Sequence, residues 1–249
     1  MHRLERPAAP QKFTDDVTDF LSTDPAAVNA SGNRRWKAFR DTQRTAYTEA
    51  RNALEANQHG LCAYCEIKLS ENNRQIEHFQ PKGSSTAQHD WTLDFSNFLL
   101  CCKGGTNNQG ARTNHSCGEK KGDAIPDDCC LNPYNLPDYP LFTLALSDDG
   151  IALAVDREAC RRAGIAANMA QSTLDCLGLN CLRLCQRRQA VYKVLDDEIA
   201  QAHSLPLAQQ KNELQSMAEA YLMPPSEFYT TKLLFLADYL PDIITMSKK

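Results

Sequence analysis

The 249-residue sequence contains no long hydrophobic run, and this absence limits the class of protein. No stretch approaches the ~20 apolar residues that a membrane helix needs, so no membrane-spanning segment is expected. Residues 1–11 carry charges and prolines but lack the apolar core of a secretory signal peptide. We therefore expect a soluble, cytoplasmic protein without membrane contacts.

An excess of positive charge is also missing. The net charge of −4 argues against nonspecific coating of nucleic acid by the whole surface, so such contacts must come from local patches. Residues 34–51 and 183–193 are rich in Arg and Lys, although solvated helix faces explain them equally well. The sequence also lacks a Gly-x4-Gly-Lys-Ser/Thr phosphate loop, so control by a nucleotide would have to come from another subunit.

Eleven cysteines are present, and in a chain without a signal peptide we expect reduced thiols, some of them metal ligands. Cys62-x2-Cys65 follows a predicted helix over residues 35–57 and is typical of half of a tetrahedral zinc site. Cys102 and Cys117 can supply the second half, with Cys101 as an alternative to Cys102. Four thiolates leave no open coordination position, so this zinc would be structural; buried free thiols are the other interpretation.

Glu77 and His78 lie in a predicted strand over residues 75–79 that ends before Pro81. A neutral imidazole can take a proton from water, and a carboxylate can hold a divalent cation, which together suit phosphodiester cleavage. Successive strand side chains point to opposite faces, so the strand must end or twist here for both to act in one site. A lone histidine is otherwise more often structural.

The remaining pattern predicts an α+β, mainly helical protein. Residues 103–116 are expected to form a loop, and alternating residues around 141–155 with Asp148-Asp149-Gly150 in the middle indicate a hairpin. Helices are expected near 205–222 and 226–239, split by Pro224-Pro225. Six apolar side chains beside this break are either a docking surface or ordinary core: Tyr221, Leu222, Phe228, Tyr229, Leu233 and Phe235.

The motifs Cys-x2-Cys, Glu-His-x2-Pro, Asn-x2-Leu-x-Cys and Cys-x3-Lys together resemble the HNH endonuclease family. More narrowly, residues 61–66, 76–82, 131–133 and 177–180 resemble the PtuB family, the HNH subunits of Septu-type antiphage systems that also accompany some retrons. The resemblance is specific over about residues 55–135 and weaker to about residue 200.

This resemblance implies a zinc-stapled ββα-metal core with flanking helices. The expected parts are an irregular lead-in (residues 1–33), an HNH nuclease domain with the zinc site (34–156) and a helical C-terminal region for partner docking (157–249). The implied partners are a PtuA-like ATPase of the SMC/ABC type, a DNA or RNA substrate, and a retron reverse transcriptase with its msDNA.

The family's residue roles carry over to positions of this sequence. His78 would be the general base, Glu77 a metal ligand, and Asn97 the residue that holds the imidazole ring. One carboxylate, one imidazole and phosphate oxygens form a hard, open site, which favours Mg²⁺ or Mn²⁺. The last position departs from the family, since Gly118 follows Cys117; His115 is the favoured third ligand, and Glu119 is the alternative.

Two other functions compete with the nuclease. A zinc-ribbon module that binds nucleic acid or protein without cutting it needs the four cysteines but not Glu77, His78 or Asn97. A thiol redox protein is a weaker candidate, because the Cys-x2-Cys motif lacks the surrounding βαβ pattern of that chemistry.

Overall fold

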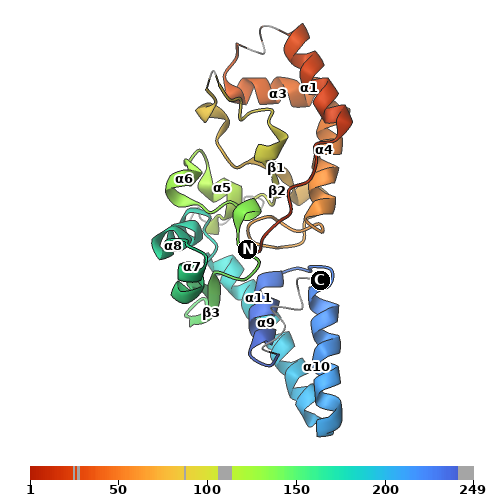
Figure 1. Cartoon of the computed structure of the whole chain (residues 1–249), viewed down its shortest axis with the longest axis vertical. Coiled ribbons are helices and arrows are strands. Elements are labelled where there is room, and N and C mark those ends of the chain that lie inside the picture. Colours follow the sequence, from red (N-terminus) through yellow and green to blue (C-terminus); the bar gives the residue numbers. More distant parts are fainter. Residues whose placement is uncertain (25, 27–28, 87, 106–113, 241–249) are drawn as a thin grey trace.

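A computed structural model describes residues 1–24, 26, 29–86, 88–105 and 114–240. It has a mixed α+β architecture in which helices dominate and two small antiparallel sheets occupy the middle of the chain (Figure 1). No helix within these residues combines the length and the apolar character needed to cross a membrane. Short 3-10 helices also occur between the larger elements: η1 (Glu71–Asn73), η2 (Lys82–Ser84), η3 (Phe95–Asn97) and η5 (Pro133–Asn135).

Among the described residues, the N-terminal part includes the helices α1 (Gln11–Thr23), α3 (Gly32–Thr42) and α4 (Arg44–Asn57). Within the expected lead-in, residues 1–33, helix α1 buries the rings of Phe13 and Phe20 in edge contacts with Phe39. The single helix expected over residues 35–57 is divided at Gln43, whose backbone is not helical.

The end of α4 directs the chain into the cysteine-rich region. Gly60 lies in the left-handed region, and its N–H donates to Glu55 O at 2.8 Å, the longer bond of a Schellman cap. The buried Gln58 side chain then donates to Leu100 O at 2.7 Å and accepts from Leu100 N at 2.8 Å. These bonds join the end of α4 to a strand far along the sequence.

That strand belongs to the first sheet, in which β1 (Gln75–His78) pairs antiparallel with β2 (Phe98–Cys101). The register places His78 opposite Phe98 and Gln75 opposite Cys101. Strand β1 confirms the strand predicted over residues 75–79. Helix α5 (Cys117–Lys121) follows this sheet in the sequence, and residues 106–113 of the expected loop lie outside the described residues.

The second sheet is the predicted hairpin, with β3 (Phe142–Ser147) and β4 (Gly150–Val155) joined at Asp148-Asp149. Short helices precede and follow it in the sequence: α6 (Pro126–Cys129), α7 (Arg157–Arg162) and α8 (Ala167–Cys176). Of these, α8 packs against β4, and α6 and α7 pack against α8. Most of the described chain shares one apolar core that runs from α1 through both sheets to α8.

The C-terminal helices are α9 (Leu182–Ser204), α10 (Leu207–Leu222) and α11 (Tyr229–Ala237), which form the lower part of the molecule as drawn in Figure 1. Helix α9 packs against β4, and α11 packs against β3. They enclose a second core that includes Leu195, Leu222 and Leu233. Five of the six apolar side chains considered for docking are buried, and Tyr221 is half-buried. The structure therefore favours core over docking surface for these residues.

Candidate metal centre and catalytic site

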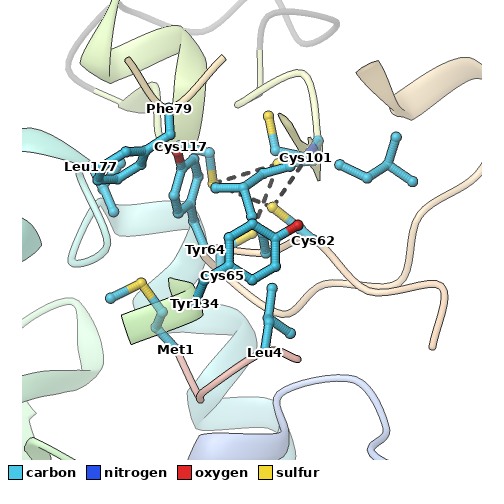
Figure 2. Packing of buried hydrophobic residues seen from close by; sticks show 14 of the residues in the cluster. Met1, Leu4, Cys62, Tyr64, Cys65, Phe79, Cys101, Cys117, Tyr134 and Leu177 are labelled. Carbon is cyan, nitrogen blue, oxygen red and sulfur yellow. Dashed lines mark hydrogen bonds between the residues drawn. The ribbon is translucent and has the colours of Figure 1, made fainter. Parts of the chain in front are cut away.

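Four cysteines from three parts of the chain meet in the main core. Cys62 and Cys65 lie in the turn after α4, Cys102 follows β2, and Cys117 begins α5. Their buried sulfurs all lie within 4.8 Å of one another. Figure 2 shows dashed contacts between the thiols, which are surrounded by buried apolar side chains.

The spacing of these sulfurs matches a tetrahedral zinc site. The Cys62–Cys117 and Cys65–Cys102 Sγ pairs are 3.7 Å apart, and Cys102–Cys117 is 3.6 Å. Four sulfurs at about 2.3 Å from one zinc ion would be about 3.8 Å apart. The set could therefore hold zinc with little movement.

The register of β2 decides between the two neighbouring cysteines. Cys101 is the last residue of β2, opposite Gln75, and it is not among the clustered ligands. Cys102 is the next residue, and successive side chains of an extended chain point to opposite sides. Only Cys102 therefore faces the other three thiols.

One sulfur of the cluster, that of Cys62, is arranged to carry negative charge. Burial raises the pKa of the Cys65 and Cys117 thiols well above the usual range. Burial also opposes a Cys62 thiolate, but hydrogen bonds from Cys102 and Cys117 outweigh it and hold the pKa of Cys62 well below the usual range. Cys102 N donates to Cys62 Sγ at 3.3 Å as well. A buried thiolate next to three further thiols is a suitable environment for a soft divalent cation.

Glu66, the residue after Cys65, ties this turn to α11 and was not singled out from the sequence. Its buried carboxylate accepts from Thr230 N at 2.8 Å and lies 3.0 Å from the Met1 amine. Burial acts to raise the pKa of Glu66, but the Met1 amine and His2 outweigh it and keep the pKa low. This contact joins the cysteine turn to the C-terminal helices.

His78 is held rigidly at the end of β1. Its Nε2 lies 2.9 Å from Thr92 O, and its ring makes edge contacts with Trp36 at 4.6 Å and Phe98 at 4.8 Å. A carbonyl can only accept, so Nε2 carries the proton and Nδ1 is the basic nitrogen. Burial, reinforced by the positive charge of Lys82, lowers the pKa of His78 to about 3. The imidazole is therefore neutral at ordinary pH.

Asn97 holds the backbone on both sides of His78. Its Oδ1 accepts from Gln80 N at 2.7 Å, and its Nδ2 donates to Gln80 O at 2.9 Å and to Trp91 O at 2.8 Å. Gln80 follows His78 closely, and Trp91 precedes Thr92, the acceptor of the His78 bond. Asn97 thus positions the imidazole through these two segments, whereas the sequence-based hypothesis had it hold the ring itself.

Glu77 contacts α5, on the side of β1 away from Trp36. Its Oε1 lies 2.9 Å from Lys121 Nζ, and a Cβ on Gly118 would meet Oε2 at 2.3 Å. Only glycine at position 118 leaves room for this carboxylate. Burial raises the pKa of Glu77 despite the opposing charge of Lys121.

Glu77 and His78 therefore contact different elements, as alternating strand side chains should. Two lysines lie near both side chains. The charge of Lys82 contributes to lowering the pKa of His78, and the charges of Lys121 and Lys82 partly offset the effect of burial on the pKa of Glu77. Lys121 also donates to the backbone carbonyls of His78 at 3.2 Å and Phe79 at 3.1 Å. The motif Cys-x3-Lys contains Lys121, but its spacing alone does not indicate this contact with Glu77.

The expected third metal ligands are not brought to Glu77. His115 is half-buried, with its backbone carbonyl close to Gly178, and Glu119 is exposed. Within the described part of the chain, the four cysteines are the only group of three or more possible metal ligands that meet closely. The structure thus brings together the thiols, but it does not assemble Glu77 with His115 or Glu119.

The two basic stretches are largely neutralised. Ion pairs join Arg35 to Asp90 at 2.6 Å, Lys37 to Asp41 at 2.7 Å and Arg187 to Glu227 at 2.6 Å. Arg188 is buried and donates to Leu179 O at 2.6 Å. These contacts favour the interpretation as structural and solvated helix faces.

Comparisons with known proteins agree with these motifs. No protein-family model matches the chain. Over 181 residues, which cover 63% of this chain and 70% of the relative, the chain is 32% identical to the predicted HNH endonuclease of retron Ec83 from Escherichia coli. Over 75 residues, 30% of this chain and 34% of the relative, it is 37% identical to the predicted HNH endonuclease of retron Vc95 from Vibrio cholerae serotype O1 biovar El Tor. The chain belongs to the HNH endonuclease family.

Proposed function

We propose that this protein is an endonuclease that hydrolyses phosphodiester bonds of a nucleic acid, with His78 as its general base. The observation that carries the proposal is the fixed, neutral imidazole at the end of β1, whose Nε2 proton is bound to Thr92 O at 2.9 Å. That bond leaves the lone pair of Nδ1 to accept a proton from an attacking water molecule.

The charge of the site suits an anionic substrate. Lys82 is half-buried and lies close enough to lower the pKa of His78, so a phosphate beside the imidazole would also meet this ammonium group. Phosphoryl transfer builds negative charge on the non-bridging oxygens, which a positioned cation stabilises. Lys82 is therefore proposed to bind the phosphate that His78-activated water attacks.

Zinc is proposed as the structural metal, because the four clustered sulfurs have the spacing of a tetrahedral site. It would staple the turn after α4 to the end of β2 and the start of α5. With four thiolate ligands it would have no position for substrate.

A second, divalent ion does not fit at Glu77 while Lys121 occupies that position. Lys121 Nζ lies 2.9 Å from Glu77 Oε1, and no other possible ligand in the described residues joins Glu77 in a group of three. Mg²⁺ or Mn²⁺ is proposed as the ion that cleavage requires, and it would bind Glu77 only after Lys121 is displaced. His115 and Glu119 stay as proposed further ligands of that ion, whereas His78 would supply the base and Lys82 the phosphate contact.

The partners are proposed from the relatives and the PtuB-like motifs. Both relatives are named as retron proteins, which supports a retron context with a reverse transcriptase and its msDNA. A PtuA-like ATPase would supply the nucleotide control for which this sequence has no phosphate loop. An antiphage role and a DNA or RNA substrate belong to the same proposal. Purification of the chain with its co-expressed ATPase and reverse transcriptase tests it.

The decisive experiment compares two histidine variants. His78→Ala should lower the cleavage rate by at least ~10²-fold, because it removes the proton acceptor. His89→Ala is a matched control, since His89 is exposed on the neighbouring loop and pairs with Asp94 at 2.8 Å. Both variants should keep their zinc. Equal cleavage by His78→Ala and wild type would rule out His78 as the base.

A non-catalytic zinc-ribbon binding module is the second candidate. The observation that favours it is the low accessibility of the site, since His78 is 4% exposed and Glu77 is tied to Lys121. Metal-dependent cleavage by wild type that is lost in His78→Ala would exclude this candidate. Nucleic-acid binding that is unchanged in His78→Ala, with no cleavage by wild type under any divalent ion, would support it.

A further inference from the structure

Two cysteines outside the zinc cluster lie closer together than the contacting sulfur pairs within it. Cys129, the last residue of α6, has its Sγ 3.0 Å from the Sγ of Cys176, the last residue of α8. The three contacting sulfur pairs of the zinc cluster are 3.6–3.7 Å apart. Both Cys129 and Cys176 are only half-buried, whereas the four clustered cysteines are buried.

The surrounding structure holds these thiols face to face. Helices α6 and α8 pack against each other, and Leu131 N donates to Thr173 Oγ1 at 2.9 Å. Cys130, the neighbour of Cys129, is buried and directs its sulfur to Leu131 O at 3.6 Å. The pair therefore contains Cys129 and not the adjacent cysteine.

A metal site does not explain the pair. Among the described residues, Cys129 and Cys176 belong to no group of three close His, Cys, Asp or Glu ligands. Two thiols at this separation need to approach by only about 1 Å to reach the S–S bond length of about 2.05 Å. Their close approach and partial exposure are conditions for disulfide formation.

We propose that Cys129 and Cys176 form a reversible disulfide when the protein meets a peroxide. The Cys129 sulfur, as thiolate, attacks one peroxide oxygen; the O–O bond breaks, and the departing hydroxide takes up a proton to leave as water. The sulfur of Cys176 then attacks the resulting sulfenic acid and displaces its oxygen, which takes the Cys176 thiol proton and leaves as a second water. Two thiols are oxidised to one disulfide while one peroxide is reduced to two waters.

The order of attack follows from the environment of each sulfur. Burial, together with the Cys129 contact, raises the pKa of Cys176 to about 12, so this thiol stays protonated and can donate to Cys129. Cys176 is therefore assigned to resolve the sulfenic acid, and the first attack is assigned to Cys129, whose Sγ lies 3.4 Å from Ile125 O.

The bond would form next to a contact of the zinc cluster. Leu177 follows Cys176 and accepts from Cys117 N at 2.7 Å, and Figure 2 shows Leu177 in the same apolar core as Cys117. Cys117 has a left-handed backbone, with φ of +59°. A disulfide at Cys176 would fix the end of α8, next to the Leu177 carbonyl that accepts the hydrogen bond from Cys117 N.

The test treats the zinc-loaded, reduced full chain with hydrogen peroxide and then maps its cysteines by mass spectrometry. Each tryptic peptide of the pair carries a second cysteine, since Cys130 follows Cys129 and Cys181 follows Cys176. Cys130→Ala and Cys181→Ala variants therefore resolve the linkage. Cys160→Ser is the matched control, because Cys160 is buried and its sulfur contacts only Leu141 O among the described hydrogen-bond partners.

Wild type, Cys130→Ala, Cys181→Ala and Cys160→Ser should each lose the mass of two hydrogen atoms, keep their zinc and recover with dithiothreitol. Cys129→Ser and Cys176→Ser should show no such loss. A disulfide that is mapped to Cys130 would overturn the proposal, and so would a loss of two hydrogen atoms in Cys129→Ser. Release of zinc in parallel with the loss of thiols, or a gain in the mass of oxygen without a disulfide, would also overturn it.

Discussion

Lys121 Nζ lies 2.9 Å from Glu77 Oε1, and both groups are nearly enclosed, with exposed side-chain fractions of 1% and 13%. This ion pair joins the first turn after the last zinc-cluster cysteine to the strand that carries His78. The ammonium group of Lys121 lies where a cation bound by Glu77 would be expected. Lys121 Nζ also donates hydrogen bonds to the backbone carbonyls of His78 and Phe79, so Lys121 is a positioning residue for the end of β1.

Lys121→Met should destabilise the protein by about 3–5 kcal/mol, because it leaves the Glu77 carboxylate buried without its partner. Urea unfolding measures this change. The double variant Glu77→Gln/Lys121→Met should recover part of the loss, since the uncompensated charge is gone. Lys120→Met is the matched control at an exposed position and should unfold like wild type. Equal stability of Lys121→Met and Lys120→Met would contradict the structural importance of the pair.

The zinc assignment predicts one zinc ion per chain, held by Cys62, Cys65, Cys102 and Cys117. Cys65→Ser should lose zinc and unfold at a markedly lower temperature, because metal binding contributes directly to folding. Cys101→Ser is the control, since Cys101 is equally buried but lies outside the cluster. Elemental analysis and thermal unfolding distinguish them, and full zinc content in Cys65→Ser would reject the assignment.

The pH dependence of cleavage should reflect the low pKa of His78. Burial lowers this pKa to about 3, and the base acts only when neutral, so kcat/KM should not change through the ordinary histidine range near pH 6.5. It should fall only as the pH approaches the folded pKa. A rise of kcat/KM centred near pH 6.5 would show that the free enzyme carries a base in a more exposed environment.

The same group should affect stability in acid. Between about pH 6.5 and 3 the unfolded chain binds a proton on His78 that the folded chain does not. The contribution of neutral His78 to the free energy of unfolding is therefore fully present above pH 6.5 and is lost as the pH falls toward 3. His78→Phe should weaken this pH dependence in urea unfolding, and an unchanged dependence would contradict the burial of a neutral imidazole.

Asn97→Ala should reduce both stability and cleavage. It removes three hydrogen bonds to the backbone of Gln80 and Trp91, so a destabilisation of about 1–3 kcal/mol and a smaller loss of rate than in His78→Ala are expected. Asn168→Ala, at an exposed position on α8, is the control. Unfolding and cleavage assays that match wild type would show that Asn97 does not position the site.

Chelation should separate the two metals. EDTA is expected to stop cleavage before it unfolds the protein, because a hard ion near carboxylate and phosphate oxygens exchanges more readily than zinc in a buried thiolate cage. Zinc content and circular dichroism measured beside activity check this order. Cleavage that persists after Mg²⁺ and Mn²⁺ are removed would contradict the need for a divalent ion.

Local chemistry was readable from the sequence where neighbouring residues decide it. The capped end of α4, the strand through His78 and the hairpin around Asp148-Asp149 follow from turn residues and apolar alternation, and the structure confirms them. The spacing of Cys62 and Cys65 likewise indicated half of a zinc site, because two intervening residues suffice to aim both sulfurs at one ion.

Only the tertiary structure decided what depends on contacts between distant segments. The β1–β2 register selects Cys102 over Cys101, and the packing of α5 on β1 brings Lys121, not His115 or Glu119, to Glu77. The burial of α11 and the approach of Cys129 to Cys176 also have no local signature. Sequence spacing limits which residues one turn can bring together, whereas packing of remote elements determines which side chains share a buried site.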